Sequence, residues 1–162
     1  PPPPFFFITP TPQSAILSGL VGSEMCIRDS GEWTRTKYEM REIFEKRAYD
    51  ISMPDIARTG LTGGKQIASI AQLYNIPIAP HVGGGGIVSV ASTLQFSLNT
   101  PNFLIMEHSE QGHAVKAMIL SEEFEAKNGQ FNLLDKPGLG IDLDEDKSVS
   151  YTHLTLPTNR EV

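Results

Sequence analysis

The chain has 162 residues and a formal net charge of −6 at neutral pH. This acidic balance argues against a nucleic-acid-binding protein, because a phosphate backbone requires basic patches. Cys26 is the only cysteine, which excludes an intrachain disulfide and a thiolate metal site. The apolar run at residues 15–21 is too short to span a bilayer and follows no basic stretch. We therefore expect a cytoplasmic protein that binds neither nucleic acid nor a membrane.

The two ends of the chain are related to each other at the level of their possible codons. Residues 25–29, MCIRD, can be written ATG TGT ATA AGA GAC, and the reverse complement of those codons encodes VSYTH, residues 149–153. Such an inverted repeat looks like the two arms of a sequencing adaptor. We therefore expect residues 1–30 and 148–162 to be adaptor-derived and non-native, and residues 31–147 to hold the domain. The alternative for the first segment is a proline-rich linker or a short export signal.

Residues 31–80 alternate between helical and strand-like stretches. A helix is predicted from Thr34, as its N-cap, with Met40, Ile43 and Phe44 on one face. A short strand within residues 49–54 ends at a proline, and a second helix follows over residues 61–74. Another strand is predicted over residues 76–80.

The alternation continues beyond a run of four glycines at residues 83–86. A third helix is predicted over residues 87–98, and a third strand over residues 102–107. Residues 108–120 form an irregular helix in this prediction, and residues 121–134 have no regular structure. The acidic run at residues 142–146 is interpreted as a solvated exit strand. Strands alternating with helices of this length indicate βαβ units and a parallel sheet.

Four ionisable residues recur in phase with these strands: Glu32, Asp55, His81 and Glu107. Their spacings are 23, 26 and 26 residues, about the length of one strand, one helix and two loops. Each lies at or just after the end of a strand-like run, so the side chains are predicted to meet at the carboxyl ends of parallel strands. In (β/α)8 barrels that edge is where active sites are built. The predicted fold class is α/β, the C-terminal half of a (β/α)8 barrel that is incomplete in this chain.

The residue types at these strand ends indicate acid–base chemistry. A carboxylate at Asp55 could hold one nitrogen of His81 and leave the imidazole as a general base. Glu32 could bind a hard cation such as Mg²⁺, or could only complement the dipole of the following helix. Glu107 could act as an acid or bind a substrate oxygen, or be an ordinary surface charge.

Other motifs carry less weight. The stretch at residues 60–65, GLTGGK, lacks the spacing of a phosphate loop and is interpreted as a turn before a helix. The four glycines after His81 either let the backbone approach a ligand or form a mobile loop. His108 and His113 lack metal-ligand spacing and are interpreted as surface or pocket-lining residues.

The motifs MPDIARTG, IPIAPH, TPNFLIMEH and KPGLGI, taken in this order, resemble the closing half of an enolase superfamily barrel. Within the superfamily they are most similar to the mandelate racemase and muconate lactonizing enzyme-like group, and there to the acid-sugar dehydratases such as galactonate dehydratase. The resemblance covers essentially all of residues 31–147 and neither flank.

This resemblance implies a Mg²⁺-dependent lyase of carbohydrate catabolism that removes the proton α to a carboxylate and then eliminates water. By position, Glu32 resembles the third metal ligand, His81 the base, Asp55 its partner, and Glu107 the acid that contacts the enediolate oxygen. The substrate would be a small sugar acid, and the parent enzyme would be a homo-oligomer.

Two departures from the family pattern matter. Many relatives carry a double glycine before the threonine that follows the Asp55 motif, whereas Gly60 is followed directly by Leu61 here. The earlier strands, the cap domain and two metal carboxylates are not found in the sequence, so we expect this chain to be inactive by itself. A racemase or epimerase of the same superfamily and a non-catalytic binding module remain alternatives.

Overall fold

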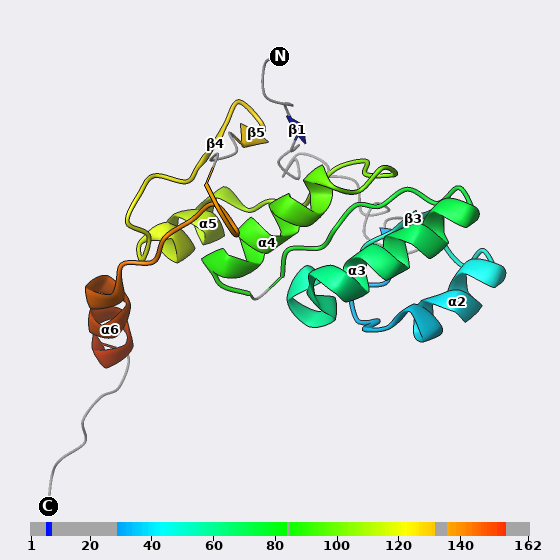
Figure 1. Cartoon of the computed structure of the whole chain (residues 1–162), viewed down its shortest axis with the longest axis horizontal. Helices are drawn as coiled ribbons and strands as arrows, with labels where there is room; N and C mark the ends of the chain where they lie inside the picture. Colours follow the sequence, from blue (N-terminus) through cyan, green and yellow to red (C-terminus); the bar gives the residue numbers. More distant parts are fainter. Residues whose placement is uncertain (1–5, 8–28, 84, 132–135, 155–162) are drawn as a thin grey trace, which may run out of the picture.

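The computed structural model describes residues 6–7, 29–83, 85–131 and 136–154. In chain order the elements are β1 (Phe6–Phe7), β2 (Asp29–Ser30), α2 (Lys37–Glu45), β3 (Ile51–Ser52), α3 (Ile56–Leu73), α4 (Ile87–Leu98), α5 (Glu110–Ala117), β4 (Ala126–Lys127), β5 (Gln130–Phe131) and α6 (Glu145–Leu154) (Figure 1). No helix in the described part of the chain is long and apolar enough to cross a membrane.

Parallel pairing links the extended segments that alternate with the helices. β2 pairs with β3 in parallel, and single parallel bridges continue the sheet from Ser52 to Ile78 and from Ile78 to Phe103. The intervening helices α2, α3 and α4 follow the extended segments in turn. This arrangement confirms the α/β prediction and is that of part of a (β/α)8 barrel, although the regular strands are shorter than the sequence suggests.

Helix α2 has the apolar face that its periodicity predicts, but its start differs from the prediction. Met40 and Phe44 are buried, and Ile43 packs against them. The N-cap is Thr36 rather than Thr34, because the Thr36 side chain accepts from the backbone N–H of Glu39 in a reciprocal capping box. Thr34 instead donates its hydroxyl to the carbonyl of Gly31, ahead of the helix.

Helix α3 contains the helix that the sequence predicts from residue 61 and a short helical stretch ahead of it. It starts at Ile56, directly after Asp55, and continues through a kink at Gly60, where φ is 67° and ψ is 168°. Only glycine adopts that conformation readily, which is why a helix can turn there. The non-helical Gly60 divides a short helical stretch at residues 56–59 from the helix over residues 61–73, so the prediction of a turn at GLTGGK before a helix is confirmed.

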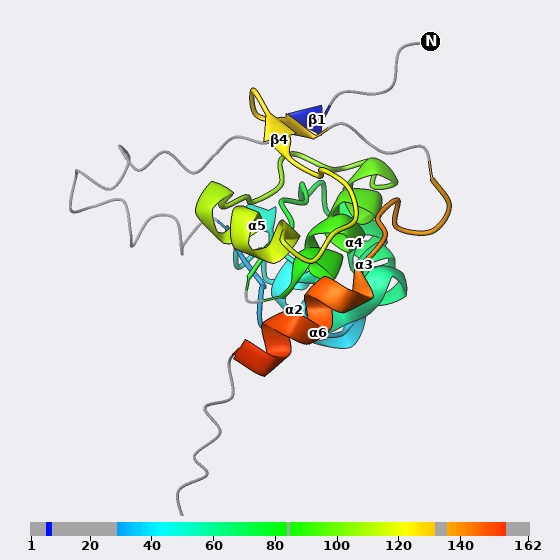
Figure 2. The ribbon, with the colours of Figure 1, turned by 90° about the vertical axis from the view of Figure 1, so that its left-hand side faces the viewer.

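Two apolar clusters form the core. The first joins α2 and α3 to the segment around Ile78, and the second joins α4 to Met106 and Phe131. Helices α3 and α4 lie side by side in both views (Figures 1 and 2), and they share more contacts than any other pair of elements. The aromatic ring of Phe96, on α4, belongs to the first cluster and so ties the two together.

The region predicted to be irregular contains a β-hairpin. β4 and β5 pair antiparallel around Asn128 and Gly129, whose φ angles of 54° and 73° are those of a tight hairpin turn. β1 adds a further antiparallel strand beside β5 (Figure 2). The prediction of no regular structure is therefore wrong for residues 126–131, while residues 132–135 lie outside the described residues.

The predicted acidic exit strand is only partly extended. Leu143 forms an antiparallel bridge with Leu120, but Glu145 and Asp146 occupy the first turn of α6. Acidic residues suit this position, because they complement the positive end of the helix dipole. Figure 1 shows α6 apart from the other helices. Most of the predicted adaptor segments, residues 1–5, 8–28 and 155–162, lie outside the described residues.

Candidate active site

The structure brings Glu32, Asp55, His81 and Glu107 together, with the imidazole of His81 at the centre. We call these four residues the strand-end cluster. His81 Nδ1 lies 3.1 Å from an Asp55 carboxylate oxygen, and Nε2 lies 3.2 Å from Glu32 and 3.6 Å from Glu107. The convergence follows from the parallel pairing, which sets Asp55 directly beside His81.

Asp55 is fixed by two separate hydrogen bonds. Its Oδ1 accepts from the backbone N–H of Ala57 as the N-cap of α3, and its Oδ2 faces His81 Nδ1. The side chain of Asp55 is buried, being only 5% exposed. An ionised carboxylate can only accept, so the Asp55 contact requires a hydrogen on Nδ1, and Nε2 points away from Asp55. The ring is thereby oriented by a residue that is itself held by a helix terminus.

The opposite side of the imidazole faces two carboxylates. Glu32 and Glu107 both approach Nε2, and their side chains are 42% and 39% exposed, so this face is open. The Glu107 carboxylate is held in place by the backbone N–H of Val82, at 3.0 Å. A proton on Nε2 would lie against the carboxylate oxygens of Glu32 and Glu107.

Two further residues join the cluster that sequence reasoning missed. The Nε of Arg58 lies 3.5 Å from the same Asp55 oxygen that faces His81, and its guanidinium stacks 4.1 Å from the centre of the Trp33 ring. Such stacking is a favourable cation–π arrangement. Arg58 could have been found from its spacing, because residues i and i+3 of one helix turn lie on the same face. Trp33 carries no comparable signal beyond its position next to Glu32.

His108 and His113 are buried, so the interpretation as surface residues is wrong. They are 7% and 5% exposed, and their rings pack on each other and on Phe131. His113 Nε2 contacts the carbonyl oxygen of Phe124. Burial lowers the pKa of His108, and the neighbouring His113 lowers it further. Both rings thus pack on phenylalanines of the second apolar cluster and lie outside the strand-end cluster.

The described residues do not by themselves form a metal site. Glu32 offers one carboxylate, but no three His, Cys, Asp or Glu side chains in the described part of the chain are placed to hold an ion together. Mg²⁺ demands near-octahedral oxygen coordination and usually takes one or two protein carboxylates together with other oxygen ligands. Any metal site would therefore need ligands besides these.

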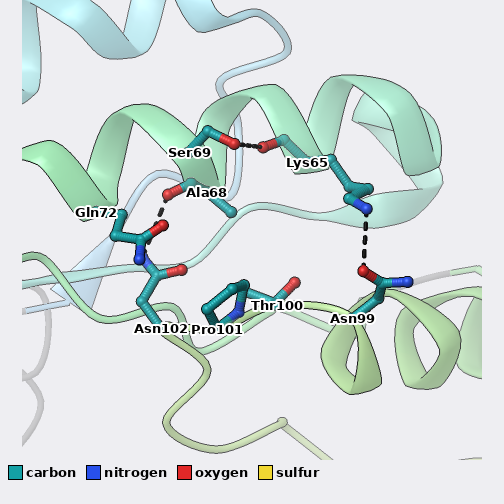
Figure 3. A pocket seen from close by; sticks show the side chains of 8 residues that line it. All are labelled: Lys65, Ala68, Ser69, Gln72, Asn99, Thr100, Pro101 and Asn102. Carbon is teal, nitrogen blue, oxygen red and sulfur yellow. Dashed lines mark hydrogen bonds between the residues drawn. The ribbon is translucent and has the colours of Figure 1, made fainter.

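A separate hollow of about 200 Å³ lies between α3 and the segment that follows α4 (Figure 3). It is lined by Lys65, Ala68, Ser69, Gln72, Asn99, Thr100, Pro101 and Asn102. Lys65 donates to the side-chain oxygen of Asn99 across one end, at 3.0 Å. Since Asn102 precedes the strand that ends at Glu107, this hollow lies at the opposite end of the strands from the strand-end cluster.

Parallel extended segments that each end in a charged side chain at one edge define this chain as part of a (β/α)8-barrel domain of the enzyme type. A model of the enolase C-terminal domain-like family matches residues 30–147, and the chain therefore belongs to that family.

Named relatives support the same assignment. The chain is 34% identical over 125 residues to D-galactarolactone cycloisomerase of Agrobacterium fabrum, covering 72% of this chain and 33% of that protein. It is 33% identical over 117 residues to D-xylonate dehydratase of Haloferax volcanii, covering 72% of this chain and 28% of that protein. The chain thus spans about a third of the length of these curated relatives.

Solved structures agree in fold. A mandelate racemase/muconate lactonizing enzyme-like protein of Rubrobacter xylanophilus superposes with a TM-score of 0.69 at 30% identity, covering 80% of this chain and 33% of that one. A member of the enolase superfamily from Agrobacterium tumefaciens gives a TM-score of 0.70 at 25% identity, with 75% and 31% covered. The predicted resemblance to this superfamily and group is confirmed.

Proposed function

We propose that this chain supplies the base-bearing strand ends of an acid-sugar dehydratase of the enolase superfamily. The observation that carries the proposal is the imidazole of His81, held by Asp55 at Nδ1 and open at Nε2 toward Glu32 and Glu107. A relative named D-xylonate dehydratase, 33% identical, supports the choice of reaction and of a sugar-acid substrate.

In the proposed reaction, His81 Nε2 takes the proton from the carbon next to the substrate carboxylate. The electron pair of that C–H bond moves onto the carboxylate and gives an enediolate, while Asp55 stabilises the imidazolium that forms. Glu107 hydrogen-bonds an oxygen of the enediolate. The electron pair then returns, the bond to the β-hydroxyl breaks, and the proton on Nε2 leaves with that hydroxyl as water. The remaining enol becomes a 2-keto acid.

Among the described residues, Glu32 is the one that we propose as a Mg²⁺ ligand. The ligands that complete its coordination would come from elsewhere in a longer protein. When bound, Mg²⁺ would neutralise the negative charge that develops on the substrate carboxylate. A chain that offers one such ligand is expected to turn over no sugar acid by itself, and removal of divalent ions by a chelator is expected to abolish activity of the complete enzyme.

The test uses the natural gene that contains the codons for residues 31–147, sequenced outward from that segment and expressed in full. Incubation of the expressed enzyme with a panel of sugar acids in deuterated water should yield 2-keto products that have lost one water and carry one deuterium on the β-carbon, measured by mass spectrometry. His81→Asn should abolish both the loss of water and the deuterium uptake at the β-carbon that accompanies it. Turnover by His81→Asn at the wild-type rate would refute the assignment of the base.

Cycloisomerisation is the second candidate, because a relative 34% identical to this chain is named D-galactarolactone cycloisomerase. A cycloisomerase product has the same mass as its substrate, whereas dehydration loses one water. An epimerase would incorporate deuterium and keep the mass otherwise unchanged. The loss of water therefore identifies a dehydratase, while NMR of the product distinguishes a cycloisomerase from an epimerase, because both can take up one deuterium without losing water. A protein that changes no substrate in the panel would favour a non-catalytic binding role.

A further inference from the structure

The backbone of Gly83 lies directly against the pair formed by His81 and Asp55. A methyl group placed on Gly83 would come within 2.4 Å of His81 Cε1 and 3.1 Å of Nδ1, and within 3.4 Å of the Asp55 carboxylate. The first of these distances is far too short for two carbon atoms. The absence of a side chain at Gly83 is therefore what allows the loop to cover one face of the imidazole.

The carbonyl of the same glycine is held from a distant part of the sequence. Lys116, on α5, donates from its ammonium group to the carbonyl oxygen of Gly83 at 3.1 Å, and the contact is partly buried. A hydrogen bond from a charged donor is stronger than one between neutral groups. Lys116 thus connects α5 to the loop that packs on His81.

The residue before Gly83 is also held. The backbone N–H of Val82 donates to Glu107, so the chain between His81 and Gly83 is fixed on one side by the Glu107 carboxylate and on the other by Lys116. These two anchors hold the backbone that lies against His81 Cε1 and Nδ1.

We propose that Lys116 is a positioning residue for the His81–Asp55 pair, which acts through the backbone of Gly83. Its ammonium holds the Gly83 carbonyl, and the Gly83 backbone holds the imidazole in the plane that keeps Nδ1 on Asp55 and Nε2 toward Glu32 and Glu107. The catalytic consequence rests on the proposed function, but the structural part stands independently of it.

The experiment is a nuclear Overhauser measurement on the full 162-residue chain, between the Cε1 hydrogen of His81 and the Cα hydrogens of Gly83. The wild-type chain and Lys116→Arg, which keeps a charged donor, should show the cross-peak. Lys116→Met should lose at least half of its intensity. Lys127→Met is the matched control, because it removes the same charge from an exposed pair with Glu123 and should leave the cross-peak unchanged.

A second pair of variants tests the contact with the imidazole directly. Gly83→Ala should move the ring and change the chemical shift of the His81 Cε1 hydrogen. Gly86→Ala, in the same glycine run, should not, because a methyl group there meets no atom within 4 Å. If Lys116→Met does not fold, Lys116→Gln replaces it, since the shorter amide cannot reach the carbonyl. An unchanged cross-peak in the Lys116 variant would overturn the proposal.

In the complete enzyme, Lys116→Met should lower kcat by about tenfold or more with KM nearly unchanged, because a misplaced catalytic group costs rate rather than binding. Lys116→Arg should restore most of the rate. Absence of activity in the wild-type enzyme would count against the proposed function only, whereas a normal kcat in Lys116→Met beside an active wild type would count against the positioning role.

Discussion

At the scale of single residues, Asp55 joins the fold to the candidate chemistry. One of its oxygens caps α3 and the other faces His81, while Arg58, one turn into the same helix, approaches the second oxygen. The helix terminus therefore fixes the carboxylate, and the carboxylate fixes the imidazole. A single substitution at Asp55 can separate these two contributions, because asparagine can cap a helix but cannot offer a charged acceptor.

Asp55→Ala is expected to lower the free energy of unfolding by about 1–2 kcal/mol, the usual cost of a lost N-cap. Asp55→Asn should cost clearly less, since asparagine caps as well as aspartate does. Urea denaturation of the two variants and the wild type measures the difference. Equal losses for both variants would mean that the charge facing Arg58 and His81, and not the cap, carries the stability of this site.

His108 makes stability depend on pH. Burial lowers the pKa of His108 in the folded protein, with His113 and Lys116 acting in the same direction and Glu110 opposing them. The unfolded chain therefore binds a proton more readily, so stability is full above the ordinary histidine pKa of about 6.5 and decreases as the pH falls through that value toward the lowered one.

The measurement is the urea midpoint of the wild type and of His108→Gln at neutral pH and at about pH 5, below the ordinary pKa. The wild type should lose more stability between the two than the variant, which has no titrating group at this position. A larger acid-induced loss in His108→Gln than in the wild type would contradict the expectation and assign the effect to other groups.

At the scale of elements, the kink in α3 depends on one glycine. Gly60 has φ 67° and ψ 168°, a conformation that costs other residues about 1–3 kcal/mol, although a methyl group there would meet no atom within 4 Å. Gly63 lies in the same helix without such a φ, and a methyl group there would make only ordinary contacts, the nearest at 3.5 Å. The two positions therefore separate backbone strain from steric contact.

Gly60→Ala should destabilise the chain by about 1–3 kcal/mol, whereas Gly63→Ala should stabilise it by about 0.5–1 kcal/mol, because alanine is the better helix former. Thermal or urea unfolding of both variants provides the comparison. An unchanged free energy of unfolding in Gly60→Ala would contradict this expectation, because it would mean that the kink does not require glycine.

The hairpin of β4 and β5 has a local sequence signal in its turn. Asn128–Gly129 is the dipeptide that most strongly indicates a two-residue hairpin turn, because both residues tolerate positive φ. The flanking strands are two residues long, too short for alternation of apolar and polar residues to be recognised. The Asn-Gly dipeptide was therefore enough to predict the turn, whereas the sequence does not predict the two short strands.

At the scale of the whole molecule, the repeat was predictable because it depends on spacing. Intervals of 23, 26 and 26 residues place Glu32, Asp55, His81 and Glu107 at one edge whatever the exact helix limits, and the structure brings them together. The contact of Lys116 with Gly83 was not predictable, because it joins residues 33 apart through the packing of α5. The burial of His108 and His113 was not predictable either, because it depends on tertiary packing and no periodic sequence pattern indicates it.

The sheet exposes an apolar side chain that can drive self-association. Leu104 follows Phe103 in the last parallel segment, donates its backbone N–H to Ile78, and is 52% exposed. Covering that exposed half would contribute about 1 kcal/mol, roughly a fivefold change in a dissociation constant. We therefore expect Leu104 to contribute to any association between copies of this chain.

Leu104→Lys should weaken this association by about fivefold or more, because it removes the apolar contact and adds a charge of the kind that keeps sheets from pairing. Sedimentation velocity over a range of protein concentrations measures the change. Leu73→Lys is the matched control: Leu73 is 80% exposed but ends α3 outside the sheet, so its replacement should leave the association unaltered. A wild-type chain that remains monomeric throughout, or equal effects of the two substitutions, would show that Leu104 does not mediate the contact, and the exposed leucine would then have no part in assembly.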